Sequence, residues 1–313
     1  MRILAWLFAC VPALWAVFRL GGLDRGYPLV PLAAFTPYVA LAGAAIVLAL
    51  VALRQWKPVT LAMVSTLALG VVLLPRAVGA EGAVGERFRV LSANVAVGSV
   101  PSANLVALVS DRKVDLLSVQ ELTPELADEL DRAGLPDLLP HAVTAPVGGA
   151  SGTGLYSRRP LRQVDPPVGG PFSQVAARTE WGPVGRFTAV AVHLPAPTST
   201  QHVQEWQTAF RGLPTGGAPR LLAGDFNATL DHSALRRLLD AGYTDAAAST
   251  GDGLGATWPA GRLFPPGIVI DHVLTTPEFR PVRTETLALT NSDHRAVYAE
   301  FVCRDVSRCP LDD

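Results

Sequence analysis

Acidic side chains are almost missing from the first quarter of the chain. Residues 1–76 contain a single acid, Asp24, whereas the 313-residue sequence has 27 acidic and 26 basic residues. The six basic residues of this segment leave 20 basic and 26 acidic residues, a formal charge of −6, for residues 77–313. The chain also lacks internal repeats and blocks of like charge. We therefore expect an apolar N-terminal part and a globular part long enough to bury its own core.

Three apolar runs occupy the N-terminal part, at Ile3–Phe18, Pro28–Leu53 and Val59–Leu74. A helix needs about 20 apolar residues to cross a bilayer, and about 17 is the practical minimum. The second run is comfortably long, and the other two approach the limit when extended to Gly22 and back to Pro58. We expect three transmembrane helices within residues 1–76, which places the two ends of the chain on opposite sides of the membrane.

The basic residues barely indicate the orientation, because they are spread over both sides of the predicted spans. They are Arg2, Arg19, Arg25, Arg54, Lys57 and Arg76. Of only three cysteines, Cys303 and Cys309 lie close enough near the C-terminus to form a disulfide, and disulfides persist outside the cytosol. We expect a multi-pass protein of the cell membrane with its globular domain outside the cytoplasm. The alternative is that the two thiols are unpaired.

Composition changes again after the apolar runs. Residues 77–86 are rich in Gly and Ala and predict a short juxtamembrane tether. Counted from Arg76, the eleven residues to Glu86 span at most about 40 Å when extended, which would keep the following domain close to the bilayer. We place that domain at residues 87–303 and a C-terminal tail at residues 304–313.

The domain alternates between strand and helix patterns. Thr123 followed by Pro124 predicts a capped helix start. Strands are predicted at 88–97, 114–120, 154–157, 174–179, 187–193, 220–224, 268–275, 283–289 and 296–302, and the other helices at 102–112, 200–213 and 232–241. Mixed elements in this order favour an α/β fold of two packed sheets with helices outside.

Polar residues interrupt the ends of these strands. They are Ser92-Ala93-Asn94, Gln120-Glu121, His193, Gly224-Asp225-Phe226-Asn227, Asp271-His272 and Ser292-Asp293-His294. Charged groups are rarely buried unless they are paired or bound to metal. One polar strand end means little, but six of metal-ligand or acid–base type predict a catalytic site.

In this order the motifs resemble the endonuclease/exonuclease/phosphatase superfamily, over about residues 87–302. That group includes secreted DNases, abasic-site endonucleases, bacterial sphingomyelinases and inositol polyphosphate phosphatases. The resemblance implies a four-layer α-β-β-α sandwich of two packed mixed sheets, with the site at one edge. It also implies a divalent-metal phosphoesterase.

Residue roles follow from the resemblance and from the need to neutralise a phosphoester's charge. Glu121 would hold Mg²⁺, with Asn94 and Asp293 near it; Mn²⁺ or Ca²⁺ is an alternative ion.

The remaining matched residues would serve the reaction itself. Asp225 would orient or deprotonate the attacking water, and Asn227 would donate to a phosphate oxygen. His294, aligned by Asp271, would face the phosphate. His193 matches a histidine that protonates the leaving oxygen, but the sequence offers it no carboxylate partner.

Several residues have a plainer interpretation. Asn94 and His193 could be structural, His272 is expected to be structural, and Trp258 is expected to be a core or rim aromatic rather than a substrate-stacking one. The histidines His141, His202 and His232 are expected at the surface.

The substrate is less defined by the sequence. The acidic domain counts mildly against a nuclease, and no Cys-Asp-Arg tripeptide of the inositol phosphatases lies within Trp258–Asp271. The apolar stretch Leu263–Ile268 could touch lipid or pack inward. The prediction is a phosphodiesterase acting on nucleic acid or lipid-linked phosphate, with the bilayer and the phosphoester as partners and no stable protein partner inferred. The alternatives are a phosphomonoesterase and an inactive membrane-tethered binding module.

Overall fold

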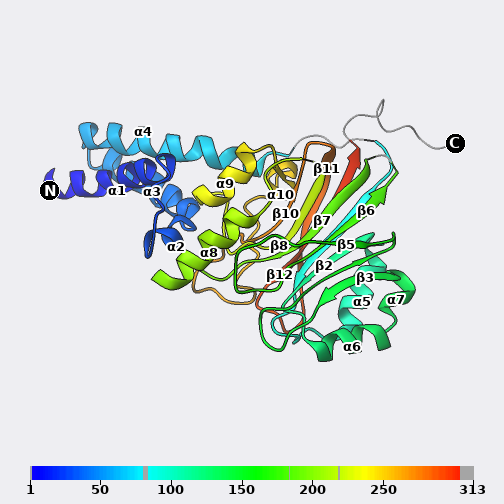
Figure 1. Cartoon of the computed structure of the whole chain (residues 1–313). Helices are drawn as coiled ribbons and strands as arrows, with labels where there is room; N and C mark the ends of the chain where they lie inside the picture. Colours follow the sequence, from blue (N-terminus) through cyan, green and yellow to red (C-terminus); the bar gives the residue numbers. More distant parts are fainter. Residues whose placement is uncertain (1, 80–83, 183, 218, 304–313) are drawn as a thin grey trace.

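The computed structural model describes residues 2–79, 84–182, 184–217 and 219–303. The N-terminal part is helical: α1 (Arg2–Leu20), α2 (Leu29–Ala33), α3 (Thr36–Ala52), α4 (Trp56–Leu73) and the 3₁₀ turn η1 (Leu74–Ala77). Helices α1, α3 and α4 pack on one another and project from one side of the sheets (Figure 1). The short helix α2 lies between this bundle and the rest of the molecule.

The apolar run Pro28–Leu53 does not form one continuous helix. The run divides at Ala34–Phe35 into α2 and α3. Pro37 stands in the first turn of α3 and lacks the N–H that a continuous helix would need there, while its ring would clash with the carbonyl group of Ala33. The run expected to be the longest span is therefore a short helix followed by a helix of 17 residues.

Two helices, Arg2–Leu20 and Trp56–Ala77, are long and apolar enough to cross a membrane by length and composition. Only 28% and 33% of their apolar windows are buried, less than a core helix of a soluble protein would show. Most of the exposed large hydrophobic side chains among the described residues lie between Ile3 and Val78. These observations are weak support for membrane association and do not fix the number of crossings.

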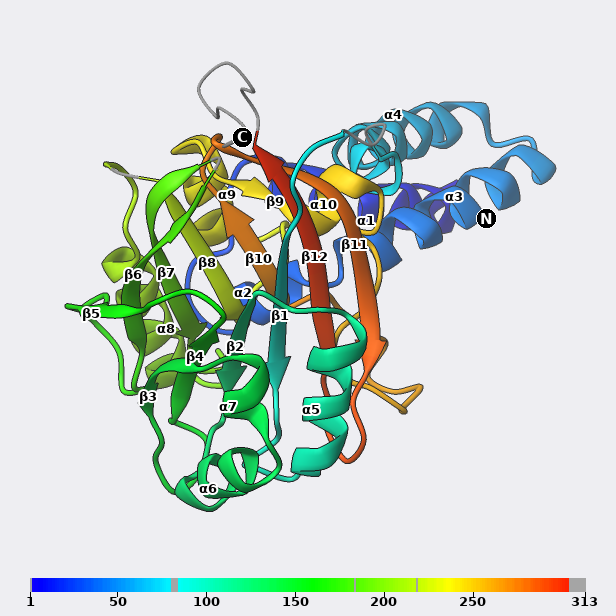
Figure 2. The same ribbon diagram turned by 90° about the vertical axis from the view of Figure 1, so that its right-hand side faces the viewer.

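The rest of the chain forms two six-stranded mixed sheets (Figure 2). The first sheet has the order β11-β12-β1-β2-β4-β3 and the second β5-β6-β7-β8-β10-β9. The strands are β1 (Phe88–Asn94), β2 (Leu116–Gln120), β3 (His141–Ala145), β4 (Thr153–Ser157), β5 (Arg162–Val164), β6 (Val175–Trp181), β7 (Gly185–His193), β8 (Arg220–Asp225), β9 (Thr244–Asp245), β10 (Asp271–Thr275), β11 (Phe279–Ala288) and β12 (Arg295–Cys303).

Helices cover the outer face of each sheet. The first sheet carries α5 (Ser102–Asp111), α6 (Pro124–Arg132) and α7 (Leu135–Leu138), and the second carries α8 (Thr200–Gly212) and α9 (Ser233–Asp240). A further short helix, α10 (Ala246–Thr250), lies against β11 and η1. Together the layers confirm the predicted fold class of two packed mixed sheets with helices outside.

Alternation of side chains along the strands builds three apolar layers. Val90 points into the core between the sheets, while its neighbour Leu91 packs under α5. In the second sheet Leu221 faces the inter-sheet core and Leu222 faces α8 and α9. Strands buried on both faces explain why the sequence shows near-continuous apolar runs there.

Polar contacts made by Arg19, Asp24 and Arg76 fix the N-terminal part to the loop before α9 and to the start of α9. Arg19 Nε lies 2.6 Å from Asp231 Oδ1, and the guanidinium of Arg76 reaches both carboxylate oxygens of Asp231 at 2.7 and 2.9 Å. Asp24 accepts hydrogen bonds from the backbone N–H and the hydroxyl of Ser233 at the start of α9. We call the buried Arg19–Asp231–Arg76 cluster the clasp.

The boundaries of the tether at 77–86 and of the tail at 304–313 remain predictions. Residues 80–83 and 304–313 lie outside the described part of the chain. At the start of the predicted tether, the Arg76 carbonyl accepts a hydrogen bond from Gly253 N and Gly79 lies against Thr250. Residues up to Gly79 therefore pack on the domain.

Candidate functional site

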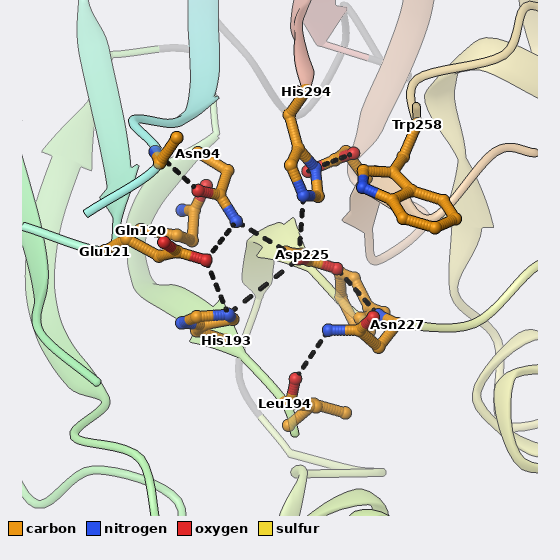
Figure 3. Close-up of polar contacts among 12 residues, drawn as sticks. Asn94, Gln120, Glu121, His193, Leu194, Asp225, Asn227, Trp258 and His294 are labelled. Carbon is orange, nitrogen blue, oxygen red and sulfur yellow. Dashed lines mark hydrogen bonds and ion pairs between the residues drawn. The ribbon is translucent and has the colours of Figure 1, made fainter. Parts of the chain in front are cut away.

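The predicted polar strand ends meet at one end of the two sheets (Figure 3). Strands β1 and β2 run parallel with Asn94 opposite Gln120, so Glu121 follows directly beside Asn94. In the other sheet, β7 and β8 run parallel with His193 opposite Asp225. The antiparallel pairing of β8 with β10 sets Asp225 opposite Asp271. Strand register alone therefore gathers these side chains from both sheets.

Asn94 connects the two carboxylates nearest the centre of the site. Its Nδ2 lies 3.2 Å from Glu121 Oε1 and 3.2 Å from Asp225 Oδ2. The second oxygen of Glu121 accepts a hydrogen bond from Val97 N at 2.8 Å. Glu121 has φ 60°, a conformation that costs free energy for a residue other than glycine and occurs most often where function requires it.

The turn after β8 orients Asp225 and Asn227. Asn227 N donates to Asp225 Oδ1 at 2.8 Å, and Asn227 Nδ2 donates to the Leu194 carbonyl at 2.8 Å. A Cβ atom on Gly224 would stand 1.8 Å from the Val192 carbonyl oxygen, so only glycine allows β7 and β8 to approach here. Burial, and then the nearby Asp271 carboxylate, raise the pKa of Asp225 to about 7.

Asp271 contacts His294, the residue that the family resemblance implied it would align. His294 Nδ1 lies 3.0 Å and 3.2 Å from the two oxygens of Asp271, and its Nε2 points toward Asp225 Oδ2 at 3.8 Å. Thr257 Oγ1 accepts hydrogen bonds from the backbone N–H groups of Ile270 and Asp271 and so fixes the start of β10. Burial alone would lower the pKa of His294, but the Asp271 carboxylate outweighs it and raises that pKa to about 10.

His193 has two carboxylates nearby, which the sequence did not reveal. Its Nε2 lies 3.9 Å from Glu121 Oε1 and 3.8 Å from Asp225 Oδ2, too far for hydrogen bonds. Burial, followed by the charge of His294, lowers the pKa of His193 to about 3. His193 is therefore a neutral imidazole at ordinary pH, suited to donating or accepting a hydrogen bond but not to supplying a proton readily.

Asp293 lies beside the others on the segment before β12. Trp258 Nε1 donates to Asp293 Oδ2 at 3.0 Å, and Ser292 Oγ donates to the Asn94 carbonyl at 2.8 Å. All eight residues predicted for metal binding and catalysis thus lie at the same end of the sheets, although their roles remain predictions. Trp258, expected to be a core or rim aromatic, holds Asp293 and also lines the cavity.

The donor set fits a hard divalent cation. Glu121 and Asp225 offer carboxylate oxygens on either side of the Asn94 amide, and Mg²⁺ prefers such oxygens. The NH₂ group of Asn94 points toward both carboxylates. The amide would have to flip for its oxygen to bind the cation.

A second grouping, Asp225, Asp271 and His294, has ligand atoms within 4.8 Å of one another. There the Asp271 oxygens already bind His294 Nδ1, so the Glu121–Asp225 side is the better fit.

One expectation about the other residues needs revision. His232 was expected at the surface, but it is buried and its Nδ1 accepts a hydrogen bond from Thr229 N. Cys303 is disulfide-bonded. Cys309 lies outside the described residues, so their pairing stays a prediction. His272 fits the expected structural role, because it bonds Asp245 and the Ala228 carbonyl, both at 2.8 Å.

A cavity of about 690 Å³ opens over the site and includes residues that sequence reasoning missed. The Phe172 ring packs against the His193 ring at a tilt of 48°, with 4.6 Å between the ring centroids. Pro31, Ala34 and Phe35, from the junction of α2 and α3, form part of the wall. Nothing in the local sequence signals this contact, because it joins segments far apart in the chain.

Comparison with known proteins agrees with this architecture. The sequence profile of the Endonuclease/Exonuclease/phosphatase family matches residues 91–294. A search of curated proteins found no match.

Solved structures with the same fold include three with low sequence identity. The endonuclease/exonuclease/phosphatase from Beutenbergia cavernae DSM 12333 has a TM-score of 0.55 and 18% identity, with 69% of this chain and 72% of that chain covered. An AP endonuclease from Archaeoglobus fulgidus has a TM-score of 0.54 and 15% identity, with 70% and 100% covered. TDP2 from D. rerio, humanized by 14 mutations, has a TM-score of 0.53 and 18% identity, with 69% and 98% covered.

These structural likenesses concern the fold alone, whereas the profile spans the motifs from β1 to the segment before β12. It covers more than half of the chain and ends at His294. The chain therefore belongs to the endonuclease/exonuclease/phosphatase family.

Proposed function

We propose that this protein is a Mg²⁺-dependent phosphodiesterase. Enzymes of the family are typically metal-dependent hydrolases. The observation that carries the proposal is the convergence of Glu121, Asp225 and the Asp271–His294 pair within one cavity. All the groups expected for phosphoester hydrolysis are present, which argues against an inactive binding module.

The cation would be held by Glu121, with Asn94 and Asp293 beside it, and would neutralise charge on the phosphoester. Asp225 orients a water molecule for attack, and its pKa near 7 in the metal-free site suits a group that accepts a proton. Its position is fixed by Asn227 N, and Asn227 itself is held through its bond to the Leu194 carbonyl.

His294 supplies positive charge on the opposite side. Its Nε2 faces Asp225 while Nδ1 is occupied by Asp271, so only Nε2 is directed toward the place where the phosphoryl group would lie. A protonated imidazole there stabilises the charge that develops on the phosphoryl oxygens. Neutral His193 would contribute a hydrogen bond from the other wall.

The same proposal places the protein in the cell membrane, with α1, α3 and α4 as three crossings and the sheets outside the cytoplasm. Support comes from the side-by-side packing of α1, α3 and α4 along a common axis (Figure 1) and from their exposed apolar side chains. The 17 residues of α3 correspond to roughly 26 Å at 1.5 Å per residue, near the lower limit for a crossing.

Hydrolysis of bis(p-nitrophenyl) phosphate by the full-length protein in detergent tests the proposal. We expect Mg²⁺-dependent release of nitrophenol that EDTA abolishes. His294→Ala should lower the rate by about 10²–10³-fold, as loss of one charge-stabilising donor does in other enzymes. His141→Ala is the matched control, because His141 lies at the end of edge strand β3 that is farther from the site. Activity that survives both EDTA and His294→Ala would sink the mechanism, and turnover of monoesters alone would favour a phosphatase.

A further inference from the structure

The cavity over the catalytic residues has two unlike halves. Its floor carries the ionisable groups of Glu121, Asp225 and His294. The rest of its lining is rich in carbon and includes Pro31, Ala34 and Phe35 from the α2–α3 junction and Pro265, Ile268 and Ile270 from the segment before β10. No lysine or arginine among the described residues lines it.

The helical wall is fixed in place. Val30 of α2 is fully buried in the apolar core of the second sheet, together with Val203 and Phe226. Tyr38 of α3 donates a hydrogen bond to the Gly267 carbonyl, which joins α3 to the segment before β10. The clasp holds the ends of α1 and η1 to the loop before α9. The α2–α3 junction is therefore a structural part of the active-site cavity.

The chemistry of this cavity disfavours a nucleic-acid strand. Protein sites for nucleic acid track the phosphate backbone with Lys and Arg, and that basic contact supplies most of the affinity. The described residues that line the cavity include no Lys or Arg that could make this contact with a polynucleotide. The apolar walls do suit a substrate that combines one phosphoester with a hydrocarbon group, because burying hydrocarbon in an apolar site is favourable.

The position of the cavity indicates where such a substrate would come from. It lies at the end of the bundle where α1 ends and α3 begins, next to the sheets. In the loop that contributes Pro265 to the wall, Leu263 and Phe264 are 98% and 85% exposed. Exposed apolar side chains beside a helical anchor are suited to contact with the bilayer interface.

We propose that the substrate is a membrane lipid bearing a phosphoester, and that Pro31, Ala34 and Phe35 bind its hydrocarbon part. The inference rests on the proposed phosphodiesterase function and adds its substrate class. The N-terminal helices then serve as an anchor and as one wall of the substrate site. Phe35, the largest side chain of that wall, is a specificity-determining residue.

Two diesters with the same leaving group test this, p-nitrophenyl methyl phosphate and p-nitrophenyl hexadecyl phosphate. Both are offered to the full-length protein in the same uncharged detergent micelles with Mg²⁺. We expect kcat/KM to be at least tenfold higher for the hexadecyl diester. Phe35→Ser should reduce the hexadecyl-to-methyl ratio at least fivefold. Leu48→Ser, at an apolar side chain of α3 that is 71% exposed and does not line the cavity, should keep the ratio.

The outcomes separate the two proposals. Hydrolysis of both diesters with equal efficiency, or a ratio that Phe35→Ser leaves unchanged, overturns the lipid inference and leaves the phosphodiesterase standing. Hydrolysis of neither diester removes the proposed function and the inference with it. Mg²⁺-dependent nicking of plasmid DNA that outpaces hexadecyl hydrolysis would assign the site to nucleic acid and also overturn the inference.

Discussion

At the scale of single residues, the charge of the site depends on the contact between Asp271 and His294. The carboxylate lies within 3.0 Å of Nδ1 and overcomes the effect of burial, which by itself would lower the imidazole's pKa. A histidine in water loses its proton near pH 6.5. In the metal-free protein, His294 should instead stay protonated until about pH 10.

NMR of labelled histidine in EDTA-treated protein measures this directly. We expect no deprotonation of His294 from pH 7 to 9, only the smaller change in its ring signals that the nearby Asp225 carboxyl causes as it ionises near pH 7. Asp271→Asn should move the midpoint of the His294 titration down to 6.5 or below. Because the folded pKa is raised, the pair's contribution to stability is complete below pH 6.5 and is lost as pH rises through about 10. A wild-type midpoint near 6.5 would contradict the assigned role of Asp271.

The clustering of the predicted site residues could be foreseen because most of them occupy a strand end that its own sequence neighbourhood marks. Asn94, Glu121 and Asp225 interrupt apolar runs, and parallel pairing then places those ends together. What the sequence hid were contacts set by tertiary packing. The carboxylates near His193 and the burial of His232 follow from the meeting of segments whose sequences carry no sign of one another.

At the scale of elements, the predicted strands and longer helices fall within a few residues of those observed, because local signals define them. Thr123 Oγ1 caps α6 as its position before Pro124 indicated. Strands β3, β5 and β9 were not predicted. At the α2–α3 junction, apolar composition suggested continuity and the backbone chemistry of Pro37 ended it. Hydropathy counts apolar residues and does not register a missing N–H group.

The clasp connects elements that are more than 150 residues apart in the chain. Asp231 is buried, and burial opposes its ionisation, but hydrogen bonds and charge from Arg76 and Arg19 outweigh that effect and lower its pKa. Asp231→Ala would leave two buried guanidinium groups without their carboxylate. Removal of one partner from a buried ion pair typically costs about 3–5 kcal/mol.

Thermal unfolding of the full-length protein in detergent measures that loss. At pH 7 we expect Asp231→Ala to lower Tm by several degrees, while Asp137→Ala, at an exposed acid of α7, leaves it unchanged. Because the folded pKa of Asp231 is lowered, its contribution is present above about pH 3.9, the value for an unfolded Asp, and is lost as pH falls below it. The difference in Tm between wild type and Asp231→Ala should therefore become smaller below pH 4. A difference in Tm that does not depend on pH would contradict the inference that Asp231 stabilises the clasp as a charged carboxylate.

At the scale of the whole molecule, the clasp also affects which orientation in the membrane the basic residues predict. Six basic residues flank the apolar helices, with no clear bias by sequence alone. Arg19 and Arg76 lie at the domain end of the bundle, where buried Asp231 neutralises part of their charge. Arg2 and the α3–α4 turn, with Arg54 and Lys57, lie at the other end.

Cytoplasmic loops carry an excess of Lys and Arg, and cations already paired with a buried carboxylate should contribute less to that bias. Arg2, Arg54 and Lys57 then outweigh Arg25 at the domain end, which favours the α3–α4 turn inside and the sheets outside.

Labelling of intact cells with a membrane-impermeant maleimide tests this orientation, in a Cys10→Ser background. We expect Leu263→Cys, at the exposed apolar loop, to react, and Gln55→Cys, in the α3–α4 turn, to react only after the cells are opened. The reverse pattern would place the catalytic cavity in the cytoplasm and restrict its lipid substrates to the inner leaflet; labelling of both sites in intact cells would mean that the bundle does not cross the membrane at all.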